Sequence, residues 1–540
     1  MNRMTGPGRY SAPAGTVAEA MSDLHRPTTY SELVVSVLER FPDRVAFEQD
    51  GRQLSYRRVA GLLAGWVALL RSRGLQPGDG VGVLSPNRPE VWLAQTAAPL
   101  SGGRYTALHP LGSLEDHLYA CDDAELRYLF VDPAYSERAG ELLERAASVE
   151  AVFTFGPAGV GEDISVAAPS VDPSGLGPGP HGPEDIGYLL YTGGTTGVPK
   201  AVMLPERALV QMVYGVALGW DLPAERRYLA CAPISHAAGM LIVPTLMAGG
   251  TVVLQRGFDP GAWLAGVSAH RASLALLVPT MIYAVLDHPD LDGADLSTLA
   301  TVMYGASPIS PSRLAEAIDR IGPVFCQLYG QTECAGITTS LWKSDHLRHD
   351  LDRLASCGRP IPGVRVAVLG DDDQPVPDGE PGEICVQGQG VMAGYWKQPE
   401  LTDTTLAGGW LRTGDVAVRG DDGFYTIVDR KKDMIVSGGF NIFPREIEDV
   451  LSTHPAVSAA AVIGVPDDKW GEAVKALVVL RPGGAAQAEE LVALVRERKG
   501  PIQAPKSVDF VDALPLTPVG KADKKVLRAR YWGAGERRVH

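Results

Sequence analysis

Apolar and polar positions repeat with two different periods along the first half of the chain. Residues 56–74 carry apolar side chains three and four positions apart, as an amphipathic helix does. Short apolar runs, suited to buried strands, follow at residues 79–86, 251–255 and 272–279. Helices that alternate with short buried strands are typical of an α/β fold. The pattern therefore predicts an α/β body from about Tyr30 to Leu286.

The pattern changes twice further along the chain. A glycine- and proline-rich segment, residues 173–185, predicts a surface connection that leads into a buried strand at residues 186–192. Beyond Arg359, short strand-like runs separated by glycine and aspartate turns predict a small β-rich subdomain. From residue 444 onward, helix, strand, strand and helix patterns follow one another, which predicts a small α+β domain. No internal repeat is present.

Composition narrows the class of protein. Of 540 residues, 45% are apolar and 21% are charged, which is typical of soluble globular proteins, and the formal charge of -15 disfavours nucleic acid or an anionic membrane as a partner. The six cysteines are scattered without a C-x-x-C pair, so neither a zinc site nor a disulfide framework is expected. No secretory leader or run long enough to span a membrane is recognised. We expect the protein in the cytoplasm.

One loop carries a strong chemical signal. Residues 191–202 read YTGGTTGVPKAV and follow the predicted strand directly. Glycines let backbone N–H groups approach phosphate oxygens, the threonine hydroxyls add donors, and Lys200 adds a positive charge. The spacing differs from that of P-loop NTPases, and no G-x-G-x-x-G opens a helix. The loop predicts a phosphate site of another type.

Four further motifs follow this loop in order. They are QLYGQTE at residues 327–333, WLRTGD at 410–415, DRKKDMIVSGGFNIFPREIE at 429–448 and PLTPVGK at 515–521. Together the five motifs resemble those of the adenylate-forming superfamily, which contains acyl-CoA synthetases, aryl-CoA ligases, luciferases and peptide-synthetase adenylation domains. The resemblance extends from about residue 54 to the C-terminal lysine.

The resemblance implies how ATP is bound. Tyr329, next to Gly330, would stack on adenine, and Asp415 and Arg430 would hold the ribose. Thr332 would contact the α-phosphate, and Glu333 would hold Mg²⁺. Gly193 stands where many members of the family have serine. The loop implied to hold the β- and γ-phosphates consists of Thr192, Gly193, Gly194, Thr195, Thr196, Gly197 and Lys200.

The resemblance also implies a two-step reaction. A carboxylic acid and ATP would form an acyl-adenylate and pyrophosphate, with Lys521 bridging the attacking carboxylate and the α-phosphate. The acyl group would then pass to the thiol of coenzyme A. Gly438 and Gly439 would lie along the pantetheine arm, while Trp470 would touch coenzyme A or belong to the core.

Between the two steps the small C-terminal domain would rotate about a hinge at Lys432. The expected organisation is therefore a large N-terminal domain at residues 1–429, a hinge at 430–432 and a mobile C-terminal domain at 433–540.

The acyl pocket is expected from two segments. In PISHAAGM, residues 233–240, His236 would lie beside the carboxylate. Small residues would leave room for an aromatic ring or a medium-length chain, and no aspartate is present to bind a substrate amine, so aryl or medium-chain acids are favoured over amino acids. The expected wall consists of Ala237, Ala238 and Gly239 with Tyr304, Gly305, Ala306 and Ser307.

Other acceptors and other acids remain open. The same adenylation chemistry serves carrier-protein phosphopantetheine, an amine or an oxygen as acceptor, and some relatives activate nitrite with ATP to diazotise an aryl amine. An alternative of another class is a nonenzymatic nucleotide-binding protein. It is disfavoured because Lys521, Glu333 and Asp415 are all present.

Overall fold

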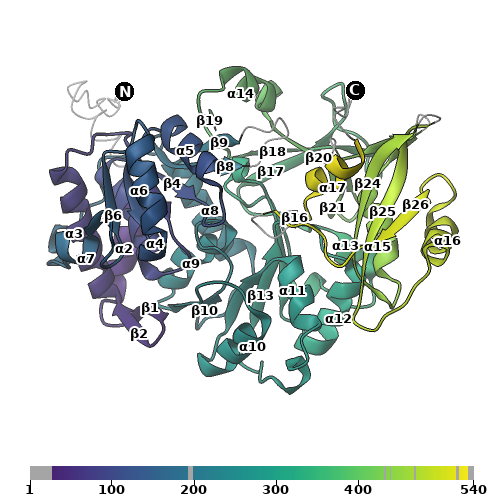
Figure 1. Ribbon diagram of the computed structural model, residues 1–540, viewed down its shortest axis with the longest axis horizontal. Coiled ribbons are helices and arrows are strands. Elements are labelled where there is room, and N and C mark those ends of the chain that lie inside the picture. Colours follow the sequence, from purple (N-terminus) through teal and green to yellow (C-terminus); the bar gives the residue numbers. More distant parts are fainter. Residues whose placement is uncertain are drawn as a thin grey trace, which may run out of the picture.

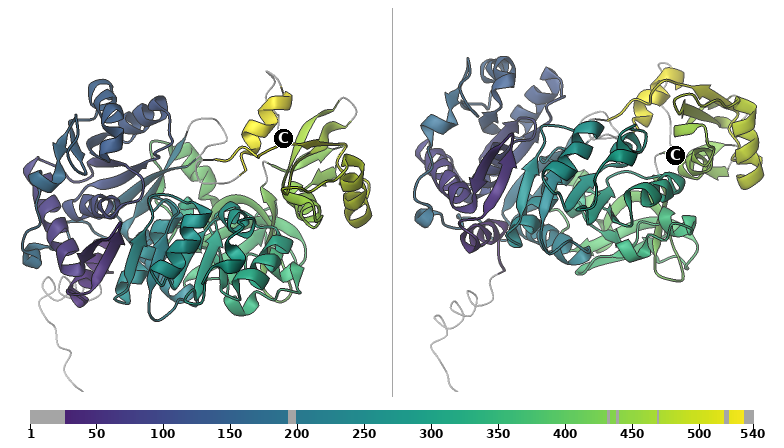
Figure 2. Two further views of the ribbon diagram at one scale, coloured as in Figure 1. Left: turned by 60° about the horizontal axis from the view of Figure 1, so that its bottom comes forward. Right: turned by 90° about the horizontal axis from the view of Figure 1, so that it is seen from below.

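The computed structural model describes residues 27–192, 199–430, 433–437, 440–467, 470–517 and 522–532. Within these ranges the strands form four sheets. Figure 1 shows the N-terminal part on the left, the middle of the chain in the centre and the C-terminal part on the right. Figure 2 shows that the C-terminal part projects from one end of the larger body.

The first sheet is mixed. Its strands from β8 to β7 run parallel, whereas β9 and β19 join one edge in antiparallel pairs. Its order is β19 (Gly394–Tyr395), β9 (Lys200–Pro205), β8 (Ile186–Thr192), β4 (Arg104–Leu108), β3 (Gly80–Leu84), β5 (Leu126–Val131), β6 (Ala151–Thr154) and β7 (Glu162–Asp163).

The second sheet is parallel from β11 to β14 and antiparallel at its ends. Strand β1 also pairs in parallel with β11. The strand order of this second sheet is β16 (Arg359–Pro360), β15 (Thr339–Leu341), β14 (Phe325–Tyr329), β13 (Thr301–Gly305), β12 (Leu274–Leu277), β10 (Arg227–Ala230), β11 (Thr251–Leu254), β1 (Val45–Gln49) and β2 (Arg52–Ser55).

A common apolar core joins the two sheets. Side chains from one face of each sheet meet helices α2 (Tyr30–Arg40), α3 (Tyr56–Ser72), α4 (Pro89–Ser101), α8 (Glu206–Gly219) and α9 (Ile242–Met247). Helix α4 is buried on all sides, as an all-round apolar helix must be. The outer face of the first sheet packs against α5 (Leu114–Asp123) and α6 (Ser136–Arg145). That of the second sheet packs against α10 (Pro260–Ala269), α11 (Pro279–Leu286) and α12 (Pro311–Ile321).

Two smaller sheets complete the described chain. The β-rich sheet has the order β17 (Val364–Leu369), β18 (Pro381–Gly388), β20 (Leu411–Arg419) and β21 (Tyr425–Arg430). Short helices α7 (Ile164–Ala167), α13 (Leu351–Ala355) and α14 (Pro399–Thr405) lie in connections.

The C-terminal sheet contains β23 (Phe440–Ile442), β22 (Ile435–Ser437), β25 (Gly471–Leu480) and β24 (Val457–Asp467), with β26 (Ser507–Phe510) also paired to β25. Helices α15 (Pro444–Ser452) and α16 (Ala488–Lys499) cover one face, and α17 (Lys524–Trp532) covers the other. In β24, Val462 points to the first core and its neighbours Ala461 and Ile463 point to the second, because strand side chains alternate.

The C-terminal part contacts the larger body through α15. Ser452 lies with its Oγ 2.6 Å from Oγ of Ser310, beside α12. Arg445 donates from Nη1 to the carbonyl oxygen of Ile427 in β21, 3.0 Å away. These contacts join the two parts in the arrangement that Figure 1 shows.

The sequence predictions for the regular elements are confirmed. The predicted helix at residues 56–74 corresponds to α3, and the apolar runs correspond to β3, β11 and β12. The mixed α/β body, the small β-rich sheet and the C-terminal α+β part also follow the predicted order. Within the described ranges, no helix combines the length and the apolar character that crossing a bilayer requires.

The buried His346 makes stability depend on pH. Its Nδ1–H donates to the carbonyl oxygen of Trp342 at 2.6 Å, and its Nε2 accepts from the hydroxyl of Tyr304 at 2.9 Å. Burial lowers the pKa of His346 to about 4. The unfolded chain binds this proton at about pH 6.5. The stabilising contribution is therefore complete above that pH and is lost as the pH falls toward about 4.

We expect the urea midpoint of the parent to fall between about pH 7 and pH 5 more steeply than that of His346→Asn, by the equivalent of about 1–2 kcal/mol. Burial raises the pKa of Asp429 and of Asp449 to about 6, which gives a contribution of opposite sign near pH 4 to 6. Both proteins retain these aspartates, so the difference between the two curves isolates His346. Parallel curves would contradict the assignment.

Candidate active site

The carboxyl ends of parallel strands bring the predicted motifs to one edge of the second sheet. Strands β10, β13 and β14 run in the same direction, so the segments that follow them start at the same edge. His236 follows β10, Ala306 and Ser307 follow β13, and Glu333 follows β14. In open α/β sheets this edge is where ligands bind.

Asp415 is the centre of a buried hydrogen-bond network. Its side chain is 5% exposed, and its Oδ2 accepts from the hydroxyl of Tyr329 at 2.8 Å and from Nε2 of Gln331 at 2.7 Å. Its Oδ1 lies 3.1 Å from Nε of Arg430, which is its register partner on β21. Left-handed backbone at Gly414 (φ 70) precedes it inside β20. Three residues predicted to bind the nucleoside, Tyr329, Asp415 and Arg430, are thus in direct contact.

Electrostatics reinforces this network. The carboxylate of Asp415 raises the pKa of the Arg430 guanidinium, which stays charged. Burial and the same carboxylate raise the pKa of Tyr329, which therefore keeps its proton and remains a donor. A carboxylate held by donors in this way has a fixed orientation, and its remaining lone pairs suit ribose hydroxyls.

The phosphate-loop residues and the predicted metal ligand converge on a second point. Thr192 and Lys200 are register partners at the open end of the β8–β9 hairpin. The ammonium of Lys200 lies 5.2 Å from the ring centroid of Tyr395, and the hydroxyl of Tyr395 donates to Oε1 of Glu333 at 2.9 Å. Thr332 and Glu333 belong to a single 3₁₀ turn, Thr332–Cys334.

The residues present fit Mg²⁺ carried by a nucleotide. In the part of the chain that the structure describes, no group of three or more His, Cys, Asp or Glu side chains could hold a metal ion alone. Mg²⁺ in phosphate sites keeps water and phosphate ligands and takes one or two carboxylates from the protein. Glu333 supplies such a carboxylate near Lys200.

The expected acyl pocket begins with a neutral histidine. Burial lowers the pKa of His236 to about 4, and the neighbouring His109 acts in the same direction. The Nδ1 atom of His236 lies 2.9 Å from Oγ of Ser235, and the rings of His236 and His109 meet edge to face at 5.5 Å. At neutral pH, His236 can therefore hydrogen-bond to a carboxylate or carbonyl without carrying charge.

The backbone constrains several of the small residues expected in the pocket wall. Ala237, Ala238 and Gly239 form the start of a 3₁₀ helix, and a Cβ at Gly239 would lie 2.2 Å from the carbonyl oxygen of Ile234. Ala306 has left-handed backbone (φ 64), which is strained for a residue with a Cβ. Gly305 lies against the carbonyl oxygen of Leu328, 2.2 Å from where a Cβ would be.

The packing does not support Tyr304 as a wall of the same pocket. Its side chain is fully buried in the core on the outer face of the second sheet, with α10 to α12, and bonds to His346. Ala238 belongs to the core on the opposite face. The strand alternation that places Met303 on one face of β13 places Tyr304 on the other.

Of the other predicted site residues, the structure describes two, Gly330 and Trp470, and the rest lie outside the described ranges. Gly330 packs closely on the backbone at Gly336, with 2.4 Å to where a Cβ would lie. Trp470 is 41% exposed. The predictions that fall outside the described residues are those for Gly193, Gly194, Thr195, Thr196, Gly197, Lys432, Gly438, Gly439 and Lys521.

Sequence reasoning missed three residues of these clusters. Gln331 belongs to the motif QLYGQTE, and its position between two predicted site residues is the signal that could have identified it. Tyr395 and His109 lie 62 and 127 positions from the residues they meet. The pairing of β19 with β9 places Tyr395, whereas His109 follows β4 of the first sheet and meets a residue that follows β10 of the second sheet. No local pattern marks them.

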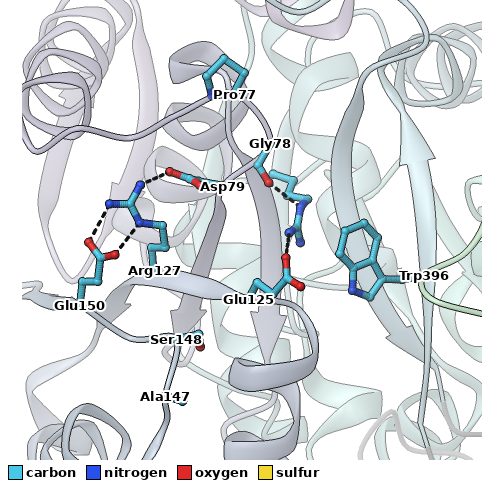
Figure 3. Close-up of a pocket in the computed structure, with 10 residues that line it drawn as sticks. Pro77, Gly78, Asp79, Glu125, Arg127, Ala147, Ser148, Glu150 and Trp396 are labelled. Atoms are coloured by element: carbon cyan, nitrogen blue, oxygen red, sulfur yellow. Dashed lines mark hydrogen bonds and ion pairs between the residues drawn. The ribbon is translucent and has the colours of Figure 1, made fainter.

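A cavity of about 540 Å³ lies elsewhere, at the amino ends of β3, β4, β5 and β6 (Figure 3). Its charged side chains are already paired. Arg127 bonds to Glu150 at 2.7 Å and to Asp79, and Arg104 lies 3.6 Å from Glu125. The described residues that line this cavity are not those of the two clusters, and their charged side chains are paired with one another.

Known proteins agree with this arrangement. Residues 35–396 match the family described as AMP-binding enzyme, and residues 446–521 match the AMP-binding enzyme C-terminal domain. The medium/long-chain-fatty-acid–CoA ligase FadD8 of Mycobacterium tuberculosis is 46% identical over 95% of this chain and 92% of its own. A feruloyl-CoA synthase of Amycolatopsis is 39% identical over 91% of this chain and 96% of its own.

A solved structure agrees as well. The amide bond synthetase McbA of Marinactinospora thermotolerans superposes with a TM-score of 0.85, at 35% identity over 93% of this chain and 100% of its own. The family matches, the relatives and the fold are all consistent with a nucleotide site at the two residue clusters. The chain belongs to the family of AMP-binding enzymes.

Proposed function

We propose that this protein uses ATP to convert a carboxylic acid into an acyl-adenylate and then transfers the acyl group to the thiol of coenzyme A. The observation that carries the proposal is the convergence of two clusters at one sheet edge. One cluster, around Asp415, suits a nucleoside. The other, around Glu333 and Lys200, suits a phosphate chain with a metal ion. The match to AMP-binding enzymes supports the same reading.

The nucleotide is held at both of its ends. Asp415 and Arg430 bind the ribose, Tyr329 stacks on adenine, and Lys200 with the loop at residues 192–197 binds the β- and γ-phosphates. Thr332 contacts the α-phosphate. Glu333 would hold Mg²⁺, which would neutralise phosphate charge.

The first step needs alignment more than a nucleophile. A carboxylate is a poor acyl donor, because its leaving group would be oxide, and adenylation makes AMP the leaving group instead. The protein brings two anions together and offsets their repulsion with lysines and backbone donors. Lys521 bridges the attacking carboxylate and the α-phosphate. His236, which burial keeps neutral, lies beside the carboxylate.

The acid is an aryl or medium-chain acid. The residues from Ala237 to Gly239, next to His236, have little or no side chain, and a Cβ at Gly239 would collide with the carbonyl oxygen of Ile234. The names of two relatives, one a medium/long-chain-fatty-acid–CoA ligase and one a feruloyl-CoA synthase, support both kinds of acid.

The second step uses a different domain arrangement. The N-terminal domain at residues 1–429 holds ATP and the acid, and the domain at residues 433–540 turns about the hinge at Lys432. This movement removes Lys521 from the reaction centre and brings Gly438 and Gly439 to the pantetheine arm. Trp470, which is exposed, is available to contact coenzyme A.

An amine is the alternative acceptor that the test includes. The similarity to McbA, an amide bond synthetase, favours an amine as the alternative acceptor. Carrier-protein phosphopantetheine and nitrite activation share the same first step and are distinguished only by the second reactant.

The test is pyrophosphate release from ATP and Mg²⁺ with benzoates, cinnamates and saturated acids of medium length. Each acid is assayed alone, with coenzyme A and with an aryl amine, and thioester and amide are quantified by mass spectrometry. Acid-dependent release accelerated by coenzyme A, with thioester formed, is the expected result. Amide in place of thioester would move the assignment to an amide synthetase, and no release with any acid would refute adenylation.

A further inference from the structure

A short strand ties the phosphate-loop hairpin to the segment that bears Glu333. Strand β19 pairs with β9, with Tyr395 opposite Val202 and Gly394 opposite Met203. Neighbouring side chains on a strand point to opposite faces. Tyr395 therefore points toward Glu333, and Trp396 points the other way, to the wall of the cavity in Figure 3.

Trp396 anchors this strand on the far side. Its Nε1 donates to the carbonyl oxygen of Asp123 at 2.8 Å, and the guanidinium of Arg104 lies 4.3 Å from its ring. The side chain of Asp123 in turn accepts from the hydroxyl of Tyr191, at the end of β8, at 2.6 Å. The strand is thus fixed to both arms of the hairpin.

Tyr395 is held just as firmly on the near side. It is 6% exposed, and its backbone N–H donates to Oγ1 of Thr402 at 2.9 Å. Its hydroxyl donates to Oε1 of Glu333 at 2.9 Å, and the N–H of Met392 donates to the carbonyl oxygen of Glu333 at 2.9 Å. Backbone and side chain of Glu333 are therefore both held by the same segment.

The hydrogen bond leaves one oxygen of Glu333 for a metal. Among the described residues, no side chain bonds to Oε2 of Glu333. The hydroxyl of Tyr395 is the donor in this hydrogen bond, since an ionised carboxylate can only accept.

We propose that Tyr395 is a positioning residue of the metal site, whose hydroxyl fixes Oε1 of Glu333 and thereby presents Oε2 to the Mg²⁺ of ATP. The inference rests on the proposed role of Glu333 and goes beyond it by naming the group that orients the ligand. Partners that orient a metal ligand commonly change metal affinity about 10- to 100-fold when they are removed.

The test separates metal binding from nucleotide binding. Tyr395→Phe removes the hydroxyl and keeps the ring next to Lys200. Calorimetry measures binding of α,β-methylene-ATP in EDTA and over a Mg²⁺ series. This analogue cannot transfer AMP to an acid, because a methylene group replaces the oxygen that bridges its α- and β-phosphates. We expect the half-saturating Mg²⁺ concentration to rise about 10-fold in the variant, with affinity in EDTA unchanged.

A matched control removes a buried tyrosine hydroxyl far from the clusters. Tyr56→Phe loses hydrogen bonds of 3.0 and 2.7 Å to the carbonyl oxygens of Leu246 and Gly250, and it should leave the Mg²⁺ dependence as in the parent. An unchanged Mg²⁺ dependence in Tyr395→Phe, or an equal loss of affinity in EDTA, would overturn the positioning role while leaving the proposed function intact. A parent whose nucleotide binding does not depend on Mg²⁺ would overturn both the positioning role of Tyr395 and the metal-binding role of Glu333.

Discussion

Replacing Lys521 with alanine is expected to slow pyrophosphate formation about 100- to 1,000-fold, because a group that stabilises charge only in the transition state is lost. The second step should not need this lysine. Transfer from a chemically prepared acyl-adenylate to coenzyme A should therefore stay within about 2-fold of the parent rate. Rapid-quench assays of each half-reaction, started from acid and ATP or from the adenylate, make the comparison.

A nearby lysine provides the control. Lys525 is exposed on α17, four positions further along the chain, and Lys525→Ala changes the local charge by the same amount. It should leave both half-reactions within about 2-fold of the parent, since an exposed charge contributes little. An equal loss in both half-reactions of Lys521→Ala would mean that the lysine supports the fold or the nucleotide rather than the attack on the α-phosphate.

The regular elements could be predicted because their signals are local. The helix at residues 56–72 has its apolar positions in the sequence itself, and the strand at residues 186–192 is marked by an apolar run before a glycine loop. The C-terminal part was predictable for the same reason, since each of its elements has its own period.

The candidate site was predictable only where a motif is contiguous. Asp415 would have been placed in an ordinary turn without its family context, yet it lies in β20 opposite Arg430, 15 positions away. The register of two strands, which no local pattern reveals, creates the pair. Tyr395 reaches Glu333 for the same reason, through the pairing of β19 with β9.

Tyr304 shows where sequence reasoning fails. Strand β13 is buried on both faces, so its residues give no polar side from which to tell the two faces apart. Motif position suggested a pocket wall for four consecutive residues. Alternation along a strand sends one side chain of such a run into the opposite core, and in β13 that side chain is Tyr304.

The second large effect is expected for Asp415→Asn, which should lower kcat/KM for ATP about 100-fold or more. Two hydrogen bonds from ribose hydroxyls to a charged acceptor contribute about 1.5–3 kcal/mol each. An amide cannot replace the carboxylate here. If the amide oxygen of the variant accepts from Tyr329 and Gln331, its NH₂ group faces the guanidinium of Arg430. In the reverse orientation the NH₂ group faces the donors of Tyr329 and Gln331.

Asp378→Asn is the matched control, because Asp378 pairs with Arg419 on the surface of the same subdomain at 2.9 Å. It should leave kcat/KM for ATP within about 2-fold of the parent.

Nucleotides that lack ribose hydroxyls turn this prediction into a test of contact. The parent should prefer ATP over 2′,3′-dideoxy-ATP by the same factor that Asp415→Asn loses with ATP, and the variant should scarcely distinguish the two nucleotides, since the effects of two groups that touch each other are not additive. Steady-state pyrophosphate release gives all four values. If Asp415→Asn discriminates between the nucleotides as strongly as the parent does, Asp415 does not bind the ribose, and its role is confined to holding Tyr329, Gln331 and Arg430 in place.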